Sequence, residues 1–315
     1  MRKLSGFWGI WDWNQRSHDE YVFKYSGGLG TYCADHIPMA IYSPEVQRTY
    51  FCYGGRTKFR NQLAHMVSYY DHSTQQVCKP TMIVNKKTDD AHDNPVLSID
   101  KDGYIWVFSS SHGLSRPSYI WKSQKPHDID NFVLIQETNF SYPQPWYLDG
   151  LGFIFLHTKY INHNRCLMWS TSKEGVKWSE EQQLSFIEKG HYQVSWPWRK
   201  KIGTAFNFHP DPGGLNYRTN LYYMETSDFG QSWQNAQGEF LKTPLQEIQN
   251  PTLVCDYAAQ GLKVYIMDIN YDSLGHPIIL YIVSKGYESG PKNDPRIWKT
   301  AYWTGEKWLI RGSIS

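Results

Sequence analysis

The segment Thr226-Ser227-Asp228-Phe229-Gly230-Gln231-Ser232-Trp233 decides the fold, because it follows the pattern Ser/Thr-x-Asp-x-Gly-x-x-Trp. Residues 171–178 repeat this pattern with lysine at the aspartate position, and residues 103–106 and 305–308 are shorter Gly-x-x-Trp echoes. In such a segment the aspartate side chain accepts backbone N–H groups, the glycine takes a positive φ, and the tryptophan packs beneath the turn. The pattern therefore predicts a recurring β-hairpin turn, which has a structural rather than a catalytic role.

Short runs of alternating polar and apolar residues surround these turns. The clearest runs are residues 49–53, 104–110, 153–160, 167–171, 220–226, 263–269 and 278–284. Helical periodicity is scarce, so we expect an all-β protein. Dividing 315 residues by the usual repeat of about 45 residues predicts about seven blades of a β-propeller. We therefore expect one propeller domain over residues 1–315 with seven four-stranded blades, six being the alternative.

The composition limits the partners and the cofactors. The formal net charge is +2, so no global field would attract nucleic acid. No apolar run approaches the length of a membrane span, and none follows Arg2 and Lys3 as in a signal peptide. The five cysteines form no C-x-x-C pair, which argues against a zinc ribbon and a dense disulfide framework. The aromatic content of 16% suits strands and, where rings are exposed, the stacking of sugars.

Two histidines are placed at the ends of one predicted hairpin. His92 precedes the run 96–99, and His112 follows the run 104–108. The outer ends of an antiparallel hairpin lie together. We therefore expect the two imidazoles to be neighbours at the rim of the fold.

The run DDAHDNPVLSIDKDGYIWVFSSSHG (89–113), with SYPQPW (141–146) and FLHTKY (155–160), resembles a known family. Together with the Asp-box pattern of residues 226–233, it is similar to the neuraminidase-repeat propellers that include ulvan lyases and rhamnose–glucuronate lyases. The resemblance extends from about residue 49 to residue 233 and is clearest over residues 89–160. It implies a seven-bladed propeller, mostly secreted or periplasmic, that cleaves uronate glycans by β-elimination.

The resemblance also implies roles for individual residues. It places His92, His112 and Tyr142 in the catalytic centre. Lys159 would stand where the family carries an arginine, and Arg218 would be a second cation beside the uronate. A lysine is a point charge that cannot clamp a carboxylate in bidentate fashion, so this position departs from the family pattern.

Further candidates for substrate binding stand at strand ends or beside the two histidines, and these are Arg56, Arg116, Asn94 and His209. The loop that begins at His209 is rich in Gly and Pro, so we expect it to be exposed. β-Elimination needs cations or strong donors that neutralise the uronate carboxylate while the C5 proton leaves. A base takes that proton and an acid protonates the leaving oxygen, and Tyr142 or a histidine suits either role.

Two other functions are open on the sequence alone. One is a non-catalytic carbohydrate-binding propeller, because fold does not determine activity. The other is a glycoside hydrolase of sialidase or rhamnosidase type. A sialidase needs an Arg-Ile-Pro signature near its N-terminus, whereas this chain has Arg296-Ile297-Trp298 near its C-terminus. We expect an anionic oligo- or polysaccharide as partner, no nucleic acid or membrane, and no required cofactor; a structural zinc or calcium ion would have ligands that the sequence does not identify.

Overall fold

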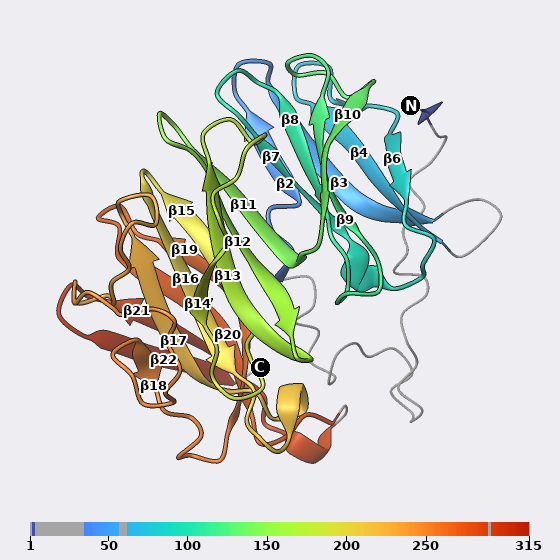
Figure 1. Cartoon of the computed structure of the whole chain (residues 1–315). Coiled ribbons are helices and arrows are strands. Elements are labelled where there is room, and N and C mark those ends of the chain that lie inside the picture. Colours follow the sequence, from blue (N-terminus) through green and yellow to red (C-terminus); the bar gives the residue numbers. More distant parts are fainter. Residues whose placement is uncertain (1, 4–34, 57–61, 289–290, 315) are drawn as a thin grey trace. The chain divides into compact units, whose positions relative to one another are not determined.

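The computed structural model describes residues 2–3, 35–56, 62–288 and 291–314. Within these ranges the chain is all-β, and its helical segments are three short 3-10 turns: η3 (Ala91–Asp93), η4 (Gly214–Tyr217) and η5 (Pro291–Asn293). The strands form five antiparallel sheets of consecutive strands, four of them four-stranded (Figure 1). No helix of the described part is long and apolar enough to span a membrane. The predicted all-β class is confirmed, whereas the number of blades and the single domain stay predictions.

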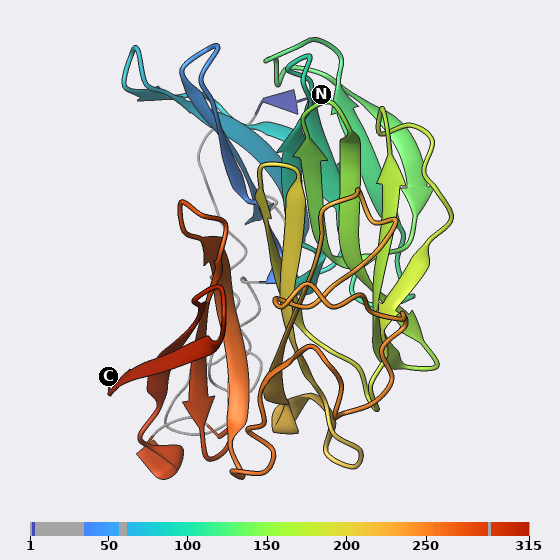
Figure 2. The same cartoon turned by 90° about the vertical axis from the view of Figure 1, so that its left-hand side faces the viewer.

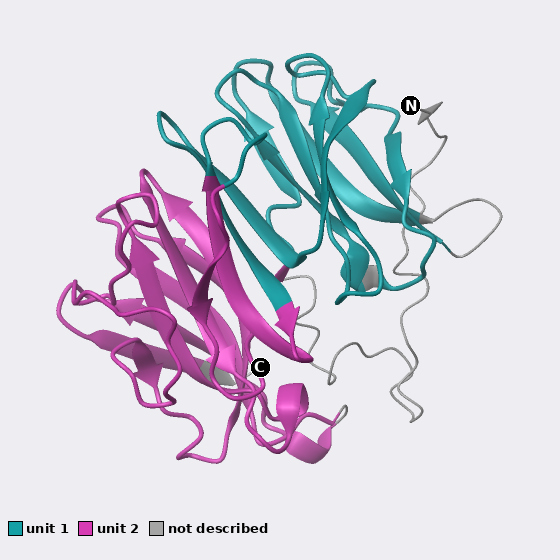
Figure 3. Ribbon diagram, in the orientation of Figure 1, with its two compact units in different colours: residues 1–14, 36–159, 172–178 teal, residues 15–35, 160–171, 179–315 magenta. Residues whose placement is uncertain are grey.

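The chain divides into two compact units (Figure 3). The main part of unit 1 is His36–Lys159 with Ser172–Trp178, and most of unit 2 is Tyr160–Thr171 with Ser179–Ser315.

Unit 1 begins with a six-stranded sheet of order β1-β6-β4-β3-β2, in which β5 also pairs with β4. These strands are β1 (Arg2–Lys3), β2 (Ala40–Ser43), β3 (Arg48–Arg56), β4 (Leu63–Asp71), β5 (Gln76–Val77) and β6 (Thr81–Asn85). The second sheet has the order β10-β9-β8-β7, with β7 (Pro95–Ile99), β8 (Ile105–Ser109), β9 (Ser118–Ser123) and β10 (Phe132–Thr138). β11 (Ser141–Leu148) and the paired β12 (Gly152–Ile161) follow.

The second sheet is buried on both faces, as a blade between two others would be. Leu97 and Val107 pack into a cluster with Tyr50 of β3, whereas Val96 and Phe108 pack with Phe155 of β12. Alternate residues of one strand point to opposite faces of its sheet. The hairpin β7–β8 is therefore packed between two apolar layers. This packing holds in place the segment before Pro95 and the segment after Ser109, which lie side by side at the open end of the hairpin.

Unit 2 contains most of the remaining strands. β13 (Asn164–Ser172) pairs with β14 (Gln182–Ser185) in the sheet of order β11-β12-β13-β14. The next sheet runs β15-β16-β17-β18 and the last runs β19-β20-β21-β22. Their bounds are β15 (Gln193–Trp198), β16 (Lys201–Phe208), β17 (Thr219–Thr226), β18 (Leu253–Cys255), β19 (Lys263–Tyr271), β20 (Pro277–Ser284), β21 (Ile297–Trp303) and β22 (Trp308–Ile314).

The turn that follows β17 has the local structure expected from its sequence. Asp228 Oδ1 accepts the backbone N–H of Ser232 at 2.9 Å and the hydroxyl of Thr226 at 2.8 Å. Gly230 has a φ of 86°, and Trp233 is buried beneath the turn. In the degenerate copy, the hydroxyl of Ser172 accepts the N–H of Gly175 at 2.8 Å. In the intact copy the hydroxyl of Thr226 accepts the N–H of Gly230 at 2.9 Å, so both copies hold the glycine of the turn through a side-chain hydroxyl.

Candidate active site

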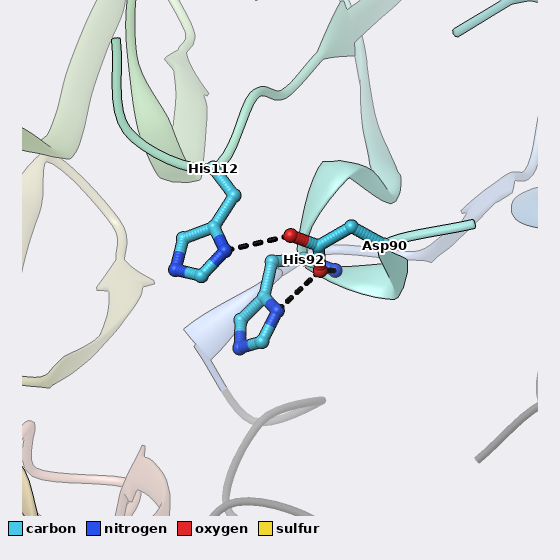
Figure 4. Close-up of side chains that lie close together, drawn as sticks. All are labelled: Asp90, His92 and His112. Carbon is cyan, nitrogen blue, oxygen red and sulfur yellow. Dashed lines mark hydrogen bonds and ion pairs between the residues drawn. The ribbon is translucent and has the colours of Figure 1, made fainter. Parts of the chain in front are cut away.

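The hairpin β7–β8 brings the two predicted histidines together. Its register runs from Pro95 opposite Ser109 to Ile99 opposite Ile105. His92 lies in η3 directly before β7, and His112 follows β8. Their rings stack at a centroid distance of 3.9 Å and an interplanar angle of 18° (Figure 4). The expected proximity of the two rings is confirmed, and their catalytic roles stay predictions.

One carboxylate holds both imidazoles. Asp90 Oδ1 lies 2.5 Å from Nδ1 of His92, and Asp90 Oδ2 lies 2.7 Å from Nδ1 of His112. A carboxylate is only an acceptor, so this network assigns a proton to both Nδ1 atoms. The two Nε2 atoms lie on the sides of the rings that face away from Asp90 (Figure 4). While the rings are neutral, both Nε2 atoms are therefore unprotonated, and both lie on the side of the histidine pair away from Asp90.

Asp90 remains charged under ordinary conditions. Burial raises the pKa of its carboxyl, but the hydrogen bond and the charge of His112, with Arg116 nearby, outweigh burial and lower that pKa below its usual value. Arg116 Nη2 lies 3.5 Å from Asp90 Oδ2. The negative charge is thus available to stabilise an imidazolium that forms on either ring.

A second carboxylate fixes the loop of His112. The side chain of Asp93 is fully buried, and its Oδ1 accepts the backbone N–H of His112 at 2.8 Å. Arg116 clamps the same carboxylate through Nε at 2.9 Å and Nη2 at 2.8 Å. Lys86 Nζ lies 3.6 Å from its other oxygen. The structure places the guanidinium of Arg116 against Asp93 and Asp90, and its binding of substrate stays a prediction.

Tyr142 reaches the histidine pair from β11. It has a φ of 49°, and its ring lies edge-on to His92 at a centroid distance of 6.1 Å. His36 lies edge-on to the same tyrosine at 5.2 Å, and its Nε2 lies 3.0 Å from the carbonyl oxygen of His92. The sequence analysis missed His36, because no motif marks it and 56 residues separate it from its partner.

The other candidates of unit 1 lie at nearby strand ends. Asn94 is buried directly before β7. Its side chain packs against Gly54 of β3, where an added Cβ atom would lie 2.0 Å from Asn94 Oδ1. Lys159 is half-buried near the end of β12, next to the Ser141–Thr158 register pair of β11 and β12. Arg56 ends β3 opposite Leu63, and its side chain lies outside the described part. Substrate binding by these three residues stays a prediction.

Arg218 and His209 belong to a buried cluster within unit 2. Arg218 stacks on the rings of Tyr265 at 4.6 Å and Tyr192 at 5.0 Å, and His209 lies edge-on to Tyr192 at 4.9 Å. Burial, together with the charges of Arg165 and Arg218, lowers the pKa of His209 well below its usual value. His209 itself, directly after β16, is buried, whereas residues 211–213 and Tyr217 of the loop that it begins are exposed as expected.

Asp90, His92 and His112 also offer ligand atoms for a metal ion that lie within 4.8 Å of one another. The Nδ1 atoms contact the carboxylate oxygens at hydrogen-bond distances, so in this arrangement the carboxylate orients both rings. A structural metal ion stays a prediction, and so do the catalytic roles of the two histidines.

Lys86 makes the stability of unit 1 dependent on pH. Burial lowers its pKa to about 8, although Asp93 opposes this shift. Between pH 8 and pH 10 the unfolded chain binds a proton that the folded chain does not, so unfolding becomes less favourable as the pH rises. We expect the stability of the wild type relative to Lys86→Met to be constant from pH 6 to pH 7.5 and to rise from pH 8 to pH 10. Urea unfolding of both proteins measures this difference, and a difference without pH dependence would contradict the buried ammonium.

Comparisons with known proteins agree with this architecture. The model of the BNR repeat-containing family matches residues 48–312. An ulvan lyase from Nonlabens ulvanivorans is 26% identical over 94% of this chain and 70% of the relative, and an ulvan lyase from Alteromonas sp. (strain LOR) is 24% identical over 95% and 68%. A solved PL25 ulvan lyase superposes with a TM-score of 0.73 at 18% identity, covering 88% of this chain and 70% of that one. A solved structure of a PL25 ulvan lyase bound to -[GlcA(1-4)Rha3S]- superposes with the same TM-score of 0.73 at 18% identity.

Consecutive four-stranded antiparallel sheets and Asp-box turns, together with the likeness to the ulvan lyases, identify a carbohydrate-active β-propeller. The family match covers most of the chain. This chain belongs to the BNR repeat-containing family.

Proposed function

We propose that this chain is a polysaccharide lyase that cleaves a uronic-acid-containing glycan of the ulvan or rhamnose–glucuronate type by β-elimination. The observation that carries the proposal is the stacked pair of His92 and His112 on the single carboxylate of Asp90, beside Tyr142. The curated relatives are named ulvan lyases, and this supports the choice of substrate class.

The chemistry requires both proton transfer and charge neutralisation. Removal of the C5 proton of a uronate places charge on its carboxyl group, and donors held in position stabilise that charge as it develops. While its Nδ1 proton is held by Asp90, a neutral imidazole has an unprotonated Nε2 that can accept the C5 proton, and Asp90 stabilises the imidazolium that results. A ring that is already protonated can instead donate from Nε2 to the uronate carboxylate or to the leaving oxygen. The electrons of the broken C5–H bond form the C4=C5 double bond, and the C4–O bond breaks as its oxygen receives a proton.

Tyr142 is the second candidate for proton transfer. Its ring lies at the edge of His92, so both groups can act on one sugar residue. A phenol serves as acid when protonated and as base when ionised. We assign His92, His112 and Tyr142 together to the two proton transfers, with either order of base and acid.

The test uses the ultraviolet absorbance of the product. We expect incubation with ulvan to produce an unsaturated uronate, whose C=C bond conjugated to the carboxylate absorbs in the ultraviolet. New reducing ends without this absorbance would identify a hydrolase and overturn the proposal. Retention of the protein on ulvan without either signal would identify a binding propeller instead.

A further inference from the structure

The far end of the first sheet of unit 1 carries a row of side chains that the catalytic site does not use. Tyr42 of β2 is opposite Thr49 of β3, Thr49 is opposite Tyr70 of β4, and Tyr70 is opposite Val77 of β5. Residues directly opposite one another in a sheet project from the same face. The row thus crosses four strands on one face, and Tyr42 and Val77 are 52% and 51% exposed at its two ends.

His72 joins the two tyrosines of this row into one rigid group. Its ring lies edge-on to Tyr42 at 5.2 Å and to Tyr70 at 4.8 Å. Its Nε2 lies 2.8 Å from the hydroxyl of Thr49, and its backbone N–H donates to the carbonyl of Gln47 at 2.9 Å. Figure 2 shows the β2–β3 turn and the β4–β5 turn, which these contacts join, at the upper left of the view.

The turn beyond β4 is also held in place. Asp71 Oδ1 accepts the backbone N–H groups of Ser73 at 3.0 Å and Thr74 at 3.2 Å. Asp71 Oδ2 pairs with Arg48 Nε at 3.0 Å, so its charge is neutralised within the sheet. Rings that are fixed before binding lose little conformational entropy when a ligand stacks on them.

We propose that Tyr42, Tyr70 and His72 form a second glycan-binding surface, which holds a part of the polysaccharide chain distant from the bond that is cleaved. We name these three residues the aromatic strip. Tyr42 is exposed and Tyr70 is half-buried. A tyrosine combines an apolar ring with a polar hydroxyl, as the faces and edges of a pyranose require. The identity of the polymer rests on the proposed function, whereas the binding surface does not depend on catalysis.

The dimensions of the sheet fit a polymer rather than a single sugar. Tyr42 and Tyr70 lie two strands apart, a distance of about 10 Å at the usual strand spacing. Along β3, Thr49 beside the aromatic strip and Gly54 against Asn94 are five residues apart, about 17 Å at the usual rise per residue, and they project from opposite faces of the sheet. A long chain can reach both ends of the strand, whereas a short oligosaccharide held in the catalytic site cannot.

The test measures polymer binding in the inactive His112→Ala background, by electrophoresis in native gels that contain ulvan. We expect Tyr42→Ala/Tyr70→Ala to weaken retention about tenfold, which corresponds to about 1.4 kcal/mol. Tyr217→Ala removes an exposed tyrosine of unit 2 and is the matched control. Because the contacts are stacked rather than ionic, the difference between the two variants should persist in 0.5 M NaCl. Equal retention of both variants, or a difference that salt abolishes, would overturn the proposal.

Kinetics in the otherwise unchanged protein give a second measurement. The ratio of kcat/KM for polymeric ulvan to kcat/KM for an ulvan tetrasaccharide should fall several-fold in the double variant and stay constant in Tyr217→Ala. A ratio that is the same in all three proteins would place the strip outside substrate binding. If the wild type lacks lyase activity but its retention depends on Tyr42 and Tyr70, the proposed function fails and the glycan-binding surface stands.

Discussion

Replacement of His112 by alanine is expected to lower kcat for ulvan cleavage by a factor of about 10² to 10⁴, the range lost when a general acid or base is removed. The side chain of His112 is 29% exposed, and its backbone N–H is held by Asp93. Truncation should therefore leave the loop in place while removing one of the two stacked imidazoles. Initial rates of ultraviolet absorbance change measure the effect.

His163→Asn is the matched control for this variant. His163 is exposed in the turn between β12 and β13 and has a φ of 64°, which asparagine tolerates. We expect wild-type rates from it. A His112→Ala protein that folds normally and retains kcat within threefold of the wild type would remove the histidine pair from the mechanism.

Asp90→Asn is expected to produce the second large loss, a decrease in kcat on the order of 10² to 10³ with a small change in KM. The amide has one acceptor oxygen and one NH₂ donor, so it can accept the Nδ1–H of one imidazole but not of both. One ring must then rotate or change its tautomer, and the negative charge that stabilises an imidazolium is lost. The same change beside a catalytic histidine costs about 10⁴ in the serine proteases.

Asp102→Asn controls for the substitution itself. Asp102 is exposed in the turn at the other end of the same hairpin, far from the paired rings. If Asp90 positions the two imidazoles, the Asp90→Asn protein should be folded, with a much lower kcat and a nearly unchanged KM. A proportional loss of activity and of folded protein in Asp90→Asn would instead assign Asp90 a purely structural role.

The fold and part of the site could be predicted because both depend on local sequence. The alternation in residues 104–110 and the turn at Gly103 determine the hairpin, and the hairpin alone brings His92 and His112 together. The turn chemistry of Asp228 and Gly230 is equally local. Such features are specified within about 20 residues of chain.

The remaining features depend on contacts that are distant in sequence. Asp90 and Asp93 look like ordinary turn residues until the fold places one beneath both rings and the other against Arg116. His36 contacts His92 across 56 residues. The aromatic strip appears only when the register of four strands is known. For His209, the Gly and Pro content of the following loop predicted exposure, but the packing of β16 extends to that residue and buries it.

The close approach of β3 to the asparagine that precedes β7 has a consequence for sequence variation. Any Cβ on Gly54 would come within 2.0 Å of Asn94 Oδ1 and 2.4 Å of Leu63 Cδ1, so every other amino acid would displace these two buried side chains, and Asn94 stands two residues after His92. A saturation scan should therefore find this glycine as intolerant as a catalytic residue, although it has no reactive group. Intolerance to substitution at such a position would report the tight fit between neighbouring strands and not contact with the sugar.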